Sequence, residues 1–345
     1  MGANRSGAIR ESNPVPVKPG TLENIVRHSR LRRRAAMRDK MRMTPPSTSL
    51  TVRLAQAALA LSLFSIVQTA SAEIAVKSGE KIGFLGDSIT AGGWGNPAGY
   101  VRLIMAGLAA NGVNAEAVPA GISGHKSNQM LDRLERDVLS KKPQWMTLSC
   151  GVNDVWHGEF GVPLDDAQAA ASTYKKRNPA DLDAGTYKKN ITQIIDKAQA
   201  AGVKVVILTA TVIKEDPATA ENKKLAPYND FLRQLAKEKH LPVADLNAMF
   251  QERIKAANKP NEKVLTSDGV HMNTEGNKLM ATGVLQEFGL NAAQLKKAED
   301  AWAPLIVQSE EAAKKAAEAK AKAAAEKAAA AKNPGPAAPA APAPK

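Results

Sequence analysis

Cysteine and aromatic residues are scarce in this chain of 345 residues. Its single cysteine, Cys150, excludes a disulfide within one chain and any zinc site built on several cysteines. Aromatic residues make up 4% of the sequence, too few for a platform that stacks single-stranded nucleic acid. The hydrophobic content of 44% is ordinary for a globular protein. We therefore interpret Cys150 as a small buried apolar residue.

The net charge of +13 is distributed unevenly and does not indicate nucleic-acid binding. Residues 1–72 carry 12 Lys/Arg and 3 Asp/Glu, residues 296–345 carry 9 and 6, and residues 73–295 carry 26 and 25. A nucleic-acid binder would concentrate positive charge on its folded part. The excess lies in the two ends instead, so we expect no nucleic-acid partner.

An apolar run of 14 residues, 54–67, lies within the basic first part of the chain. It follows Arg53 and precedes the small residues ASA at 70–72, which together predict a secretory signal cleaved near Ala72. The run is short for a membrane span, which needs about 20 residues. We expect an exported protein, periplasmic or extracellular, and an uncleaved membrane anchor is the alternative.

Three methionines, Met37, Met41 and Met43, lie just upstream of the apolar run. Translation from one of them would give the signal its usual short basic flank, so we expect residues 1–36 to be either not translated or not structural. Sequencing the amino terminus of the precursor tests this, and a peptide from residues 1–30 in cells would contradict it.

The composition changes again toward the carboxyl end. Residues 310–332 are rich in Ala, Lys and Glu, which predicts an exposed helix. The Pro/Ala segment 333–345 predicts an extended spacer. This tail is either an inert solvated extension or a contact with an anionic cell wall or membrane surface. We divide the chain into a basic leader with the secretory signal (1–72), a folded domain (73–306) and the tail (307–345).

Short apolar runs alternate with stretches of helical periodicity in the folded domain. This alternation predicts a mostly parallel sheet covered by helices on both faces, with the functional site beyond the carboxyl ends of the strands. The stretch 158–189 has no clear strand character and is predicted to be a lid or a substrate wall. The predicted strands are 82–85, 115–119, 145–149, 203–209 and 241–246, and the predicted helices are 100–110, 128–139, 187–201, 228–239 and a closing helix at 276–288.

The segment GDSIT, residues 86–90, follows the first predicted strand directly. It places Ser88 at a strand's carboxyl end, where a nucleophile belongs, although a serine there could also cap the next helix. Thr90 stands where the nucleophile elbow of α/β-hydrolases needs glycine, and the lysine of a phosphate-binding loop is absent.

The segment DGVH, residues 268–271, pairs a carboxylate with an imidazole three positions later. Asp268 can fold back within one turn and hold Nδ1 of His271, which leaves the other ring nitrogen to accept a proton from a serine. A turn with a surface histidine is the alternative for this segment considered alone.

Two further segments, GISGH at 121–125 and GVND at 151–154, each follow a predicted strand. The backbone N–H of Gly124, where a side chain would obstruct, and the amide of Asn153 can join the N–H of Ser88 as donors to an oxyanion. The carboxylates next to Ser88 and Asn153 in the sequence, Asp87 and Asp154, are predicted to brace these loops.

Together these four segments resemble the blocks of the SGNH hydrolases, also called GDSL esterases or lipases. The resemblance implies a flavodoxin-like three-layer α/β/α sandwich with a mostly parallel five-stranded sheet. It also implies ester hydrolysis through an acyl-serine, without a metal or organic cofactor. By the same resemblance Ser88 is the nucleophile, His271 the general base and Asp268 its orienting carboxylate, while Gly124, Asn153 and the Ser88 N–H bind the oxyanion.

The region from residue 121 onward is similar to exported bacterial members that are often classed as carbohydrate esterases. That similarity implies removal of a short acyl group, such as acetyl, from a saccharide. Trp156 is placed to stack on a sugar ring and His157 to contact a polar group, with simple packing an equal alternative for Trp156. A lysophospholipase or thioesterase is the second hypothesis, and a non-catalytic cell-wall-binding protein is the third.

Overall fold

The computed structural model describes residues 73–171, 183–259 and 262–332. The predicted leader with its apolar run, and the Pro/Ala spacer, lie outside these residues. No helix within the three described ranges is long and apolar enough to span a membrane.

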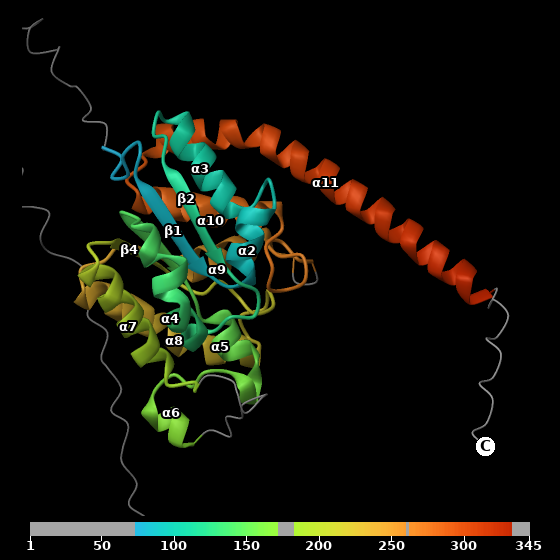
Figure 1. Cartoon of the computed structure of the whole chain (residues 1–345). Helices are drawn as coiled ribbons and strands as arrows, with labels where there is room; N and C mark the ends of the chain where they lie inside the picture. Colours follow the sequence, from blue (N-terminus) through green and yellow to red (C-terminus); the bar gives the residue numbers. More distant parts are fainter. Residues whose placement is uncertain (1–72, 172–182, 260–261, 333–345) are drawn as a thin grey trace, which may run out of the picture. The chain divides into compact units, whose positions relative to one another are not determined.

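A parallel sheet forms the centre of the fold (Figure 1). Its strand order is β2-β1-β3-β4-β5, and every neighbouring pair is parallel, because each connection crosses over through helices. The central strands β1, β3 and β4 are almost fully buried, as continuous apolar runs in a sheet covered on both faces should be. The strands are β1 (Lys81–Gly86), β2 (Glu116–Gly121), β3 (Trp145–Ser149), β4 (Lys204–Leu208) and β5 (Val243–Ala244).

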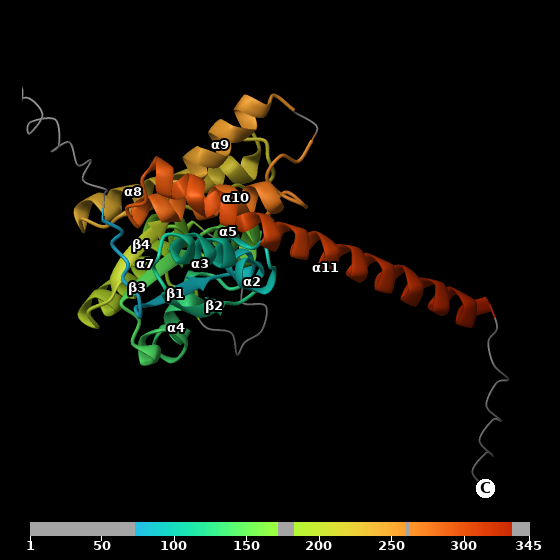
Figure 2. The same ribbon diagram turned by 90° about the horizontal axis from the view of Figure 1, so that it is seen from above.

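Helices cover the sheet on both faces, so the architecture is the expected α/β/α sandwich (Figure 2). Helices α3, α10 and α11 pack together on one face, whereas α4 and α7 lie side by side on the other and α7 contacts α8. The helices are α2 (Ser88–Gly95), α3 (Tyr100–Ala110), α4 (Ser127–Asp137), α5 (Val152–Trp156), α6 (Asp166–Ala170), α7 (Tyr187–Ala200), α8 (Ala220–Glu238), α9 (Leu246–Ala257), α10 (Thr274–Glu287) and α11 (Ala292–Lys332), with short 3₁₀ turns at Leu139–Lys141 and Gly158–Phe160.

Most predicted elements occur within a few residues of their expected bounds, and the exceptions have local causes. Helix α8 begins eight residues before the predicted start, because the side chain of Thr219 caps it and Pro227 is accommodated inside it. The strand predicted at 241–246 is wrong beyond Ala244: Asp245 caps the next helix, α9, which the sequence analysis missed. The stretch 158–189 contains α6 and the start of α7; residues 172–182 lie outside the described part.

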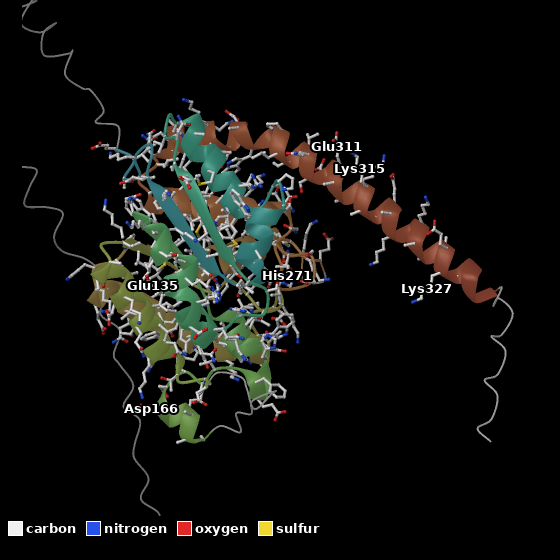
Figure 3. All side chains as sticks on the ribbon, in the orientation of Figure 1. Glu135, Asp166, His271, Glu311, Lys315 and Lys327 are labelled. Carbon is white, nitrogen blue, oxygen red and sulfur yellow. The ribbon has the colours of Figure 1, made fainter. Side chains whose placement is uncertain are left out.

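Helix α10 is not the closing helix, since α11 follows it and joins the core. The indole of Trp302 is 1% exposed, and its Nε1 donates to the carbonyl oxygen of Leu103 at 2.8 Å. The helix continues without a break past residue 307, and from Glu310 onward its described side chains are exposed. Figure 3 shows Glu311, Lys315 and Lys327 on this outer half. Helix α11 therefore has two halves. Its apolar face packs against the core as far as about residue 306, and the rest of the helix is solvated.

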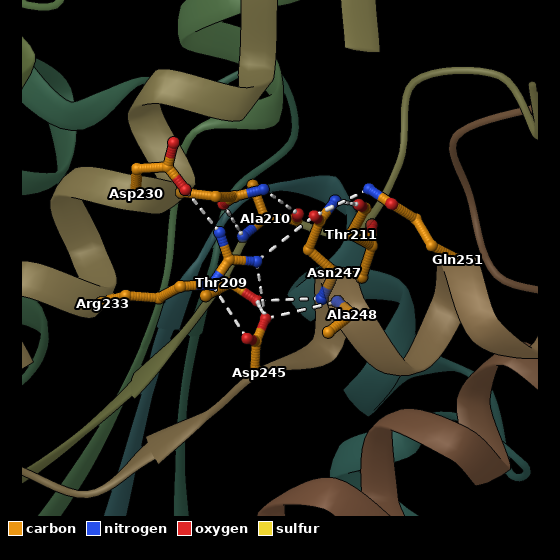
Figure 4. A network of polar contacts seen from close by, with 10 residues as sticks. Thr209, Ala210, Thr211, Asp230, Arg233, Asp245, Asn247, Ala248 and Gln251 are labelled. Atoms are coloured by element: carbon orange, nitrogen blue, oxygen red, sulfur yellow. Dashed lines mark hydrogen bonds and ion pairs between the residues drawn. The ribbon is translucent and has the colours of Figure 1, made fainter. Parts of the chain in front are cut away.

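A polar network connects the carboxyl end of β4 to α8 and α9 (Figure 4). Arg233 donates to both carboxylate oxygens of Asp245, at 2.8 and 2.9 Å, and Thr209 donates to Asp245 at 3.0 Å. Thr209 in turn accepts the backbone N–H of Asn247 at 2.8 Å. The bidentate pair of Arg233 and Asp245 thus attaches α8 to the residue that follows β5, the short edge strand.

Candidate active site

Ser88 lies where the first strand ends and the first helix begins. Strand β1 finishes at Gly86, and Asp87 caps α2 by accepting the N–H of Ile89 at 2.9 Å. Ser88 is therefore the first residue of α2, at the carboxyl edge of a central strand. This is the rim on which a doubly wound sheet carries its functional groups.

His271 and Asp268 are brought to Ser88 from the other end of the sequence. Nε2 of His271 lies 2.8 Å from Oγ of Ser88, and Nδ1 lies 2.7 Å from Oδ2 of Asp268. The other oxygen of Asp268 accepts the backbone N–H of His271 at 2.8 Å and that of Val270 at 2.9 Å. The three side chains thus form a continuous relay with the geometry of a nucleophile, a base and an orienting carboxylate.

The carboxylate of Asp268 is ionised throughout the neutral range. Its partial burial would raise its pKa, but hydrogen bonds from the ring and backbone of His271 outweigh burial and lower the pKa to about 2. The side chains of His271 and Asp268 are 39% and 52% exposed. The relay therefore lies on an open surface, accessible to a bulky substrate.

Glu215 fixes the loop that precedes this turn. Its carboxylate accepts the backbone N–H groups of Val264, Leu265 and Thr266 at 2.6, 2.9 and 2.6 Å, and the hydroxyl of Thr266 at 2.6 Å. The backbone N–H of Gly269 then donates to the Thr266 hydroxyl at 3.1 Å. Glu215 was not singled out in the sequence, where no local pattern marks it.

Gly124 lies in the β2–α4 loop, residues 122–126, with a φ of +79°. A Cβ built on it would meet no atom within 4 Å. A side chain at position 124 would therefore meet no part of the protein itself. A left-handed backbone conformation requires glycine here, and no obstructing neighbour does. The residue is exposed.

Asn153 follows β3 and lies in the first turn of α5, with 4% of its surface exposed. Its Nδ2 donates to the carbonyl oxygen of His125 at 3.2 Å. Within the described part of the chain, the second hydrogen of this amide has no acceptor. The amide is thus attached to the β2–α4 loop by one of its two hydrogens.

Two buried carboxylates support the turns beneath these groups. The pKa of Asp87 is raised to about 7, chiefly by burial and in smaller part by the nearby Asp154, against the hydrogen bond from Ile89, which lowers it. Burial also raises the pKa of Asp154, which accepts the N–H of Ser127 at 3.0 Å. Asp154 contacts Sγ of Cys150 at 3.4 Å, and Cys150 is 3% exposed. Cys150 is thus buried, as predicted, although it has a polar partner.

Trp156 ends α5 and is 45% exposed, so about half of its surface is packed and half faces solvent. Its ring centroid lies 6.2 Å from that of His157. An exposed indole is a surface on which a sugar ring could stack. Across the described residues, no group of three or more His, Cys, Asp or Glu side chains is placed to hold a metal ion.

Comparison with known proteins gives consistent matches. The model of the GDSL-like lipase/acylhydrolase family matches residues 84–279. An acetylxylan esterase from Geobacillus stearothermophilus is 26% identical over 226 residues, which are 62% of this chain and 96% of that protein. An uncharacterized lipoprotein, YqeF, from Bacillus subtilis is 22% identical over 195 residues, 50% of this chain and 72% of that protein.

Solved structures give the same result. The acetyl xylan esterase AlAXEase superposes with a TM-score of 0.50 and 32% identity, covering 60% of this chain and 98% of that chain. The acetylxylan esterase Axe2 from Geobacillus stearothermophilus superposes with a TM-score of 0.51 and 25% identity, covering 63% and 97%.

Proposed function

Because this chain belongs to the GDSL-like lipase/acylhydrolase family, we propose that it is a serine esterase that removes acetyl groups from a carbohydrate. The observation that carries the proposal is the relay of Ser88, His271 and Asp268, with contacts of 2.8 and 2.7 Å, at the carboxyl edge of the sheet. The acetylxylan esterases match this chain over nearly their full length, which supports the choice of substrate.

The first half of the reaction forms an acyl-serine. Oγ of Ser88 bonds to the ester carbonyl carbon while its proton passes to Nε2 of His271. The carbonyl electron pair moves onto its oxygen and returns as the bond to the alcohol oxygen breaks. That oxygen leaves with the proton from His271. Asp268, ionised, stabilises the imidazolium that forms between these steps.

The second half returns the enzyme to its starting state. A water molecule attacks the acyl carbon and gives a proton to Nε2 of His271. The bond to Oγ of Ser88 then breaks, Oγ takes this proton, and acetate is released. In both halves, negative charge on the carbonyl oxygen would meet the N–H groups of Ser88 and Gly124 and the amide of Asn153.

The open surface around the relay supports a saccharide ester in preference to a long acyl chain. His271 and Asp268 are partly exposed, and the indole of Trp156, at the end of α5, is exposed as well. We propose that Trp156 stacks on a sugar ring and that His157 contacts a polar group of the same substrate. A buried channel is not needed for an acetyl group carried on a large alcohol.

Two substrate series test this function. The purified protein should release acetate from acetylated xylo-oligosaccharides and should prefer p-nitrophenyl acetate to the octanoate by about tenfold or more in kcat/KM. The Ser88→Ala variant is the blank for both. A preference for octanoate would instead support a lysophospholipase or thioesterase.

We propose in addition that the protein is exported after cleavage near Ala72, and that the outer half of α11 contacts an anionic cell surface. Residues 296–345 carry 9 Lys/Arg against 6 Asp/Glu, and the described side chains from Glu310 onward are exposed. The protein should sediment with isolated cell walls, and a chain ending at Ser309 should remain in solution with an unchanged rate on p-nitrophenyl acetate. Equal sedimentation would show that the tail is inert.

A further inference from the structure

A buried guanidinium lies beneath the β2–α4 loop. Arg133 belongs to α4, and its side chain is 1% exposed. Its Nη2 donates to the carbonyl oxygen of Gly86 at 2.8 Å, its Nε to Nδ1 of His125 at 3.1 Å, and its Nη1 to Asp137 at 3.1 Å. One side chain thus joins the end of β1, the β2–α4 loop and α4.

His125 connects Arg133 to Asn153 and to the loop that carries Gly124. Its ring accepts from Arg133, and its carbonyl oxygen accepts from Nδ2 of Asn153 at 3.2 Å. Its backbone N–H donates to Ile122 at 3.2 Å, which closes the loop around Gly124. The backbone N–H of Ile122 in turn donates to Gly86 at 3.1 Å, so the same carbonyl oxygen receives the loop and the guanidinium.

We propose that Arg133 and His125 are positioning residues for the oxyanion donors. In this arrangement Arg133 holds the ring of His125, and His125 holds the amide of Asn153 and the backbone around Gly124. The inference rests on the proposed esterase function, because it assigns a role within the same site. It adds two residues that do not touch the substrate and act through residues that do.

The energetics favour a positioning role over a purely stabilising one. A guanidinium loses its hydration when it is buried, and apolar residues of similar size would avoid that cost. The planar fork of arginine, however, can donate in several fixed directions at once, which joins segments that no apolar side chain could register. Burial, and then the positive charge of Arg133, lower the pKa of His125. A neutral ring leaves Nδ1 free to accept.

His125 is the better residue to vary, because removing the buried guanidinium would take one donor from both Gly86 and Asp137, leave a cavity in the core and could unfold the protein. The side chain of His125 is half-buried. His125→Gln retains a carbonyl oxygen that can accept from Arg133, whereas His125→Phe retains the size of the ring and removes the acceptor. The two variants form a matched pair.

The experiment measures kcat and KM for p-nitrophenyl acetate in the full protein, in both variants, and in each variant combined with Asn153→Ala. We expect His125→Phe to lower kcat by about 10- to 100-fold with KM changed less than about twofold, and His125→Gln to retain most of the rate. In the Asn153→Ala background the effect of His125→Phe should shrink to less than about threefold, because the two residues act as one unit.

Equal losses in the Gln and Phe variants, or full additivity with Asn153→Ala, would overturn the inference. Hydrolysis by the wild-type protein, and its loss in Ser88→Ala, test the esterase function separately. Failure of that function is therefore distinguishable from failure of the positioning role. Independently of activity, ¹⁵N-histidine NMR at neutral pH should show His125 with an unprotonated Nδ1, assigned by its loss in His125→Gln. A protonated Nδ1 would also overturn the inference.

Discussion

Asp268 binds His271 twice, once through Oδ2 to the ring Nδ1 at 2.7 Å and once through Oδ1 to the backbone N–H at 2.8 Å. The same residue therefore orients the imidazole and shapes the turn that carries it. Because its pKa is lowered to about 2, this carboxylate does not titrate between about pH 4 and pH 9.

Replacing the carboxylate of Asp268 by an amide removes its charge and retains the size of the side chain. Asp268→Asn retains Oδ1 for the backbone N–H groups but presents an amide nitrogen to Nδ1, which favours the wrong tautomer of His271. We expect kcat to fall by about 10²- to 10⁴-fold with a melting temperature close to that of the wild type. Steady-state kinetics with thermal unfolding checks this, and a rate within threefold of the wild type would remove Asp268 from the relay.

The buried carboxylate of Asp87 should make stability depend on pH. Its pKa is raised to about 7 in the folded protein and is about 3.9 in an unfolded chain. Between these values the folded state keeps a proton that the unfolded state has lost, so stability falls as pH rises from about 4 to about 7. Asp87→Asn retains an oxygen for the N–H of Ile89 and removes this titration.

We therefore expect Asp87→Asn to reduce the loss of unfolding free energy between pH 5 and pH 8 by roughly 1–3 kcal/mol. Urea unfolding at the two pH values measures it. Asp132→Asn is the control, because Asp132 is exposed. Parallel pH profiles for the Asp87 variant and the wild type would contradict the assignment.

Glu215 should matter for activity although it lies outside the relay. Its carboxylate accepts three consecutive backbone N–H groups, from Val264 to Thr266. In Glu215→Gln the amide nitrogen cannot accept, so one or more of these donors loses its partner. We expect the variant to unfold about 1–3 kcal/mol more easily and kcat to fall more than KM rises. Urea unfolding and steady-state kinetics measure both effects, with Glu238→Gln on the surface as control; an unchanged kcat would separate this loop from His271.

Trp156 should affect large substrates and spare small ones. If its exposed indole stacks on a sugar ring, Trp156→Ala should raise KM for acetylated xylo-oligosaccharides by about 5- to 30-fold, the loss of a stacking contact worth about 1–2 kcal/mol. The kcat/KM for p-nitrophenyl acetate should change less than about twofold. Comparison of the two substrates in one preparation provides its own control, and equal effects on both would place Trp156 in the relay's support.

The sequence predicted the sheet and the placement of the relay because both depend on local signals. The buried strands are continuous apolar runs such as 203–209, and the polar segments follow them directly. In a parallel sheet those strand ends meet at one edge, so Ser88, Gly124 and Asn153 could be expected together. His271 follows no strand, and its place beside Ser88, 183 positions away, was expected from the family resemblance.

The supporting residues could not be predicted in the same way. Glu215 acts on residues about 50 positions away, and nothing in its neighbourhood indicates this. Arg133 had a signal that was not used, since it lies among the apolar positions of α4, on the side that faces the core. Helix α9 was missed because Asp245, its cap, interrupts what reads as a strand.

The role of Ser88 as the nucleophile is tested by the rate of p-nitrophenyl acetate hydrolysis in the Ser88→Ala variant, measured beside Ser123→Ala. Ser123 is exposed in the β2–α4 loop and has no role in the mechanism. If Ser88 is the nucleophile, Ser123→Ala keeps the wild-type rate and Ser88→Ala loses at least about 10³-fold. Hydrolysis by Ser88→Ala at the rate of the Ser123 variant would contradict the acyl-serine mechanism.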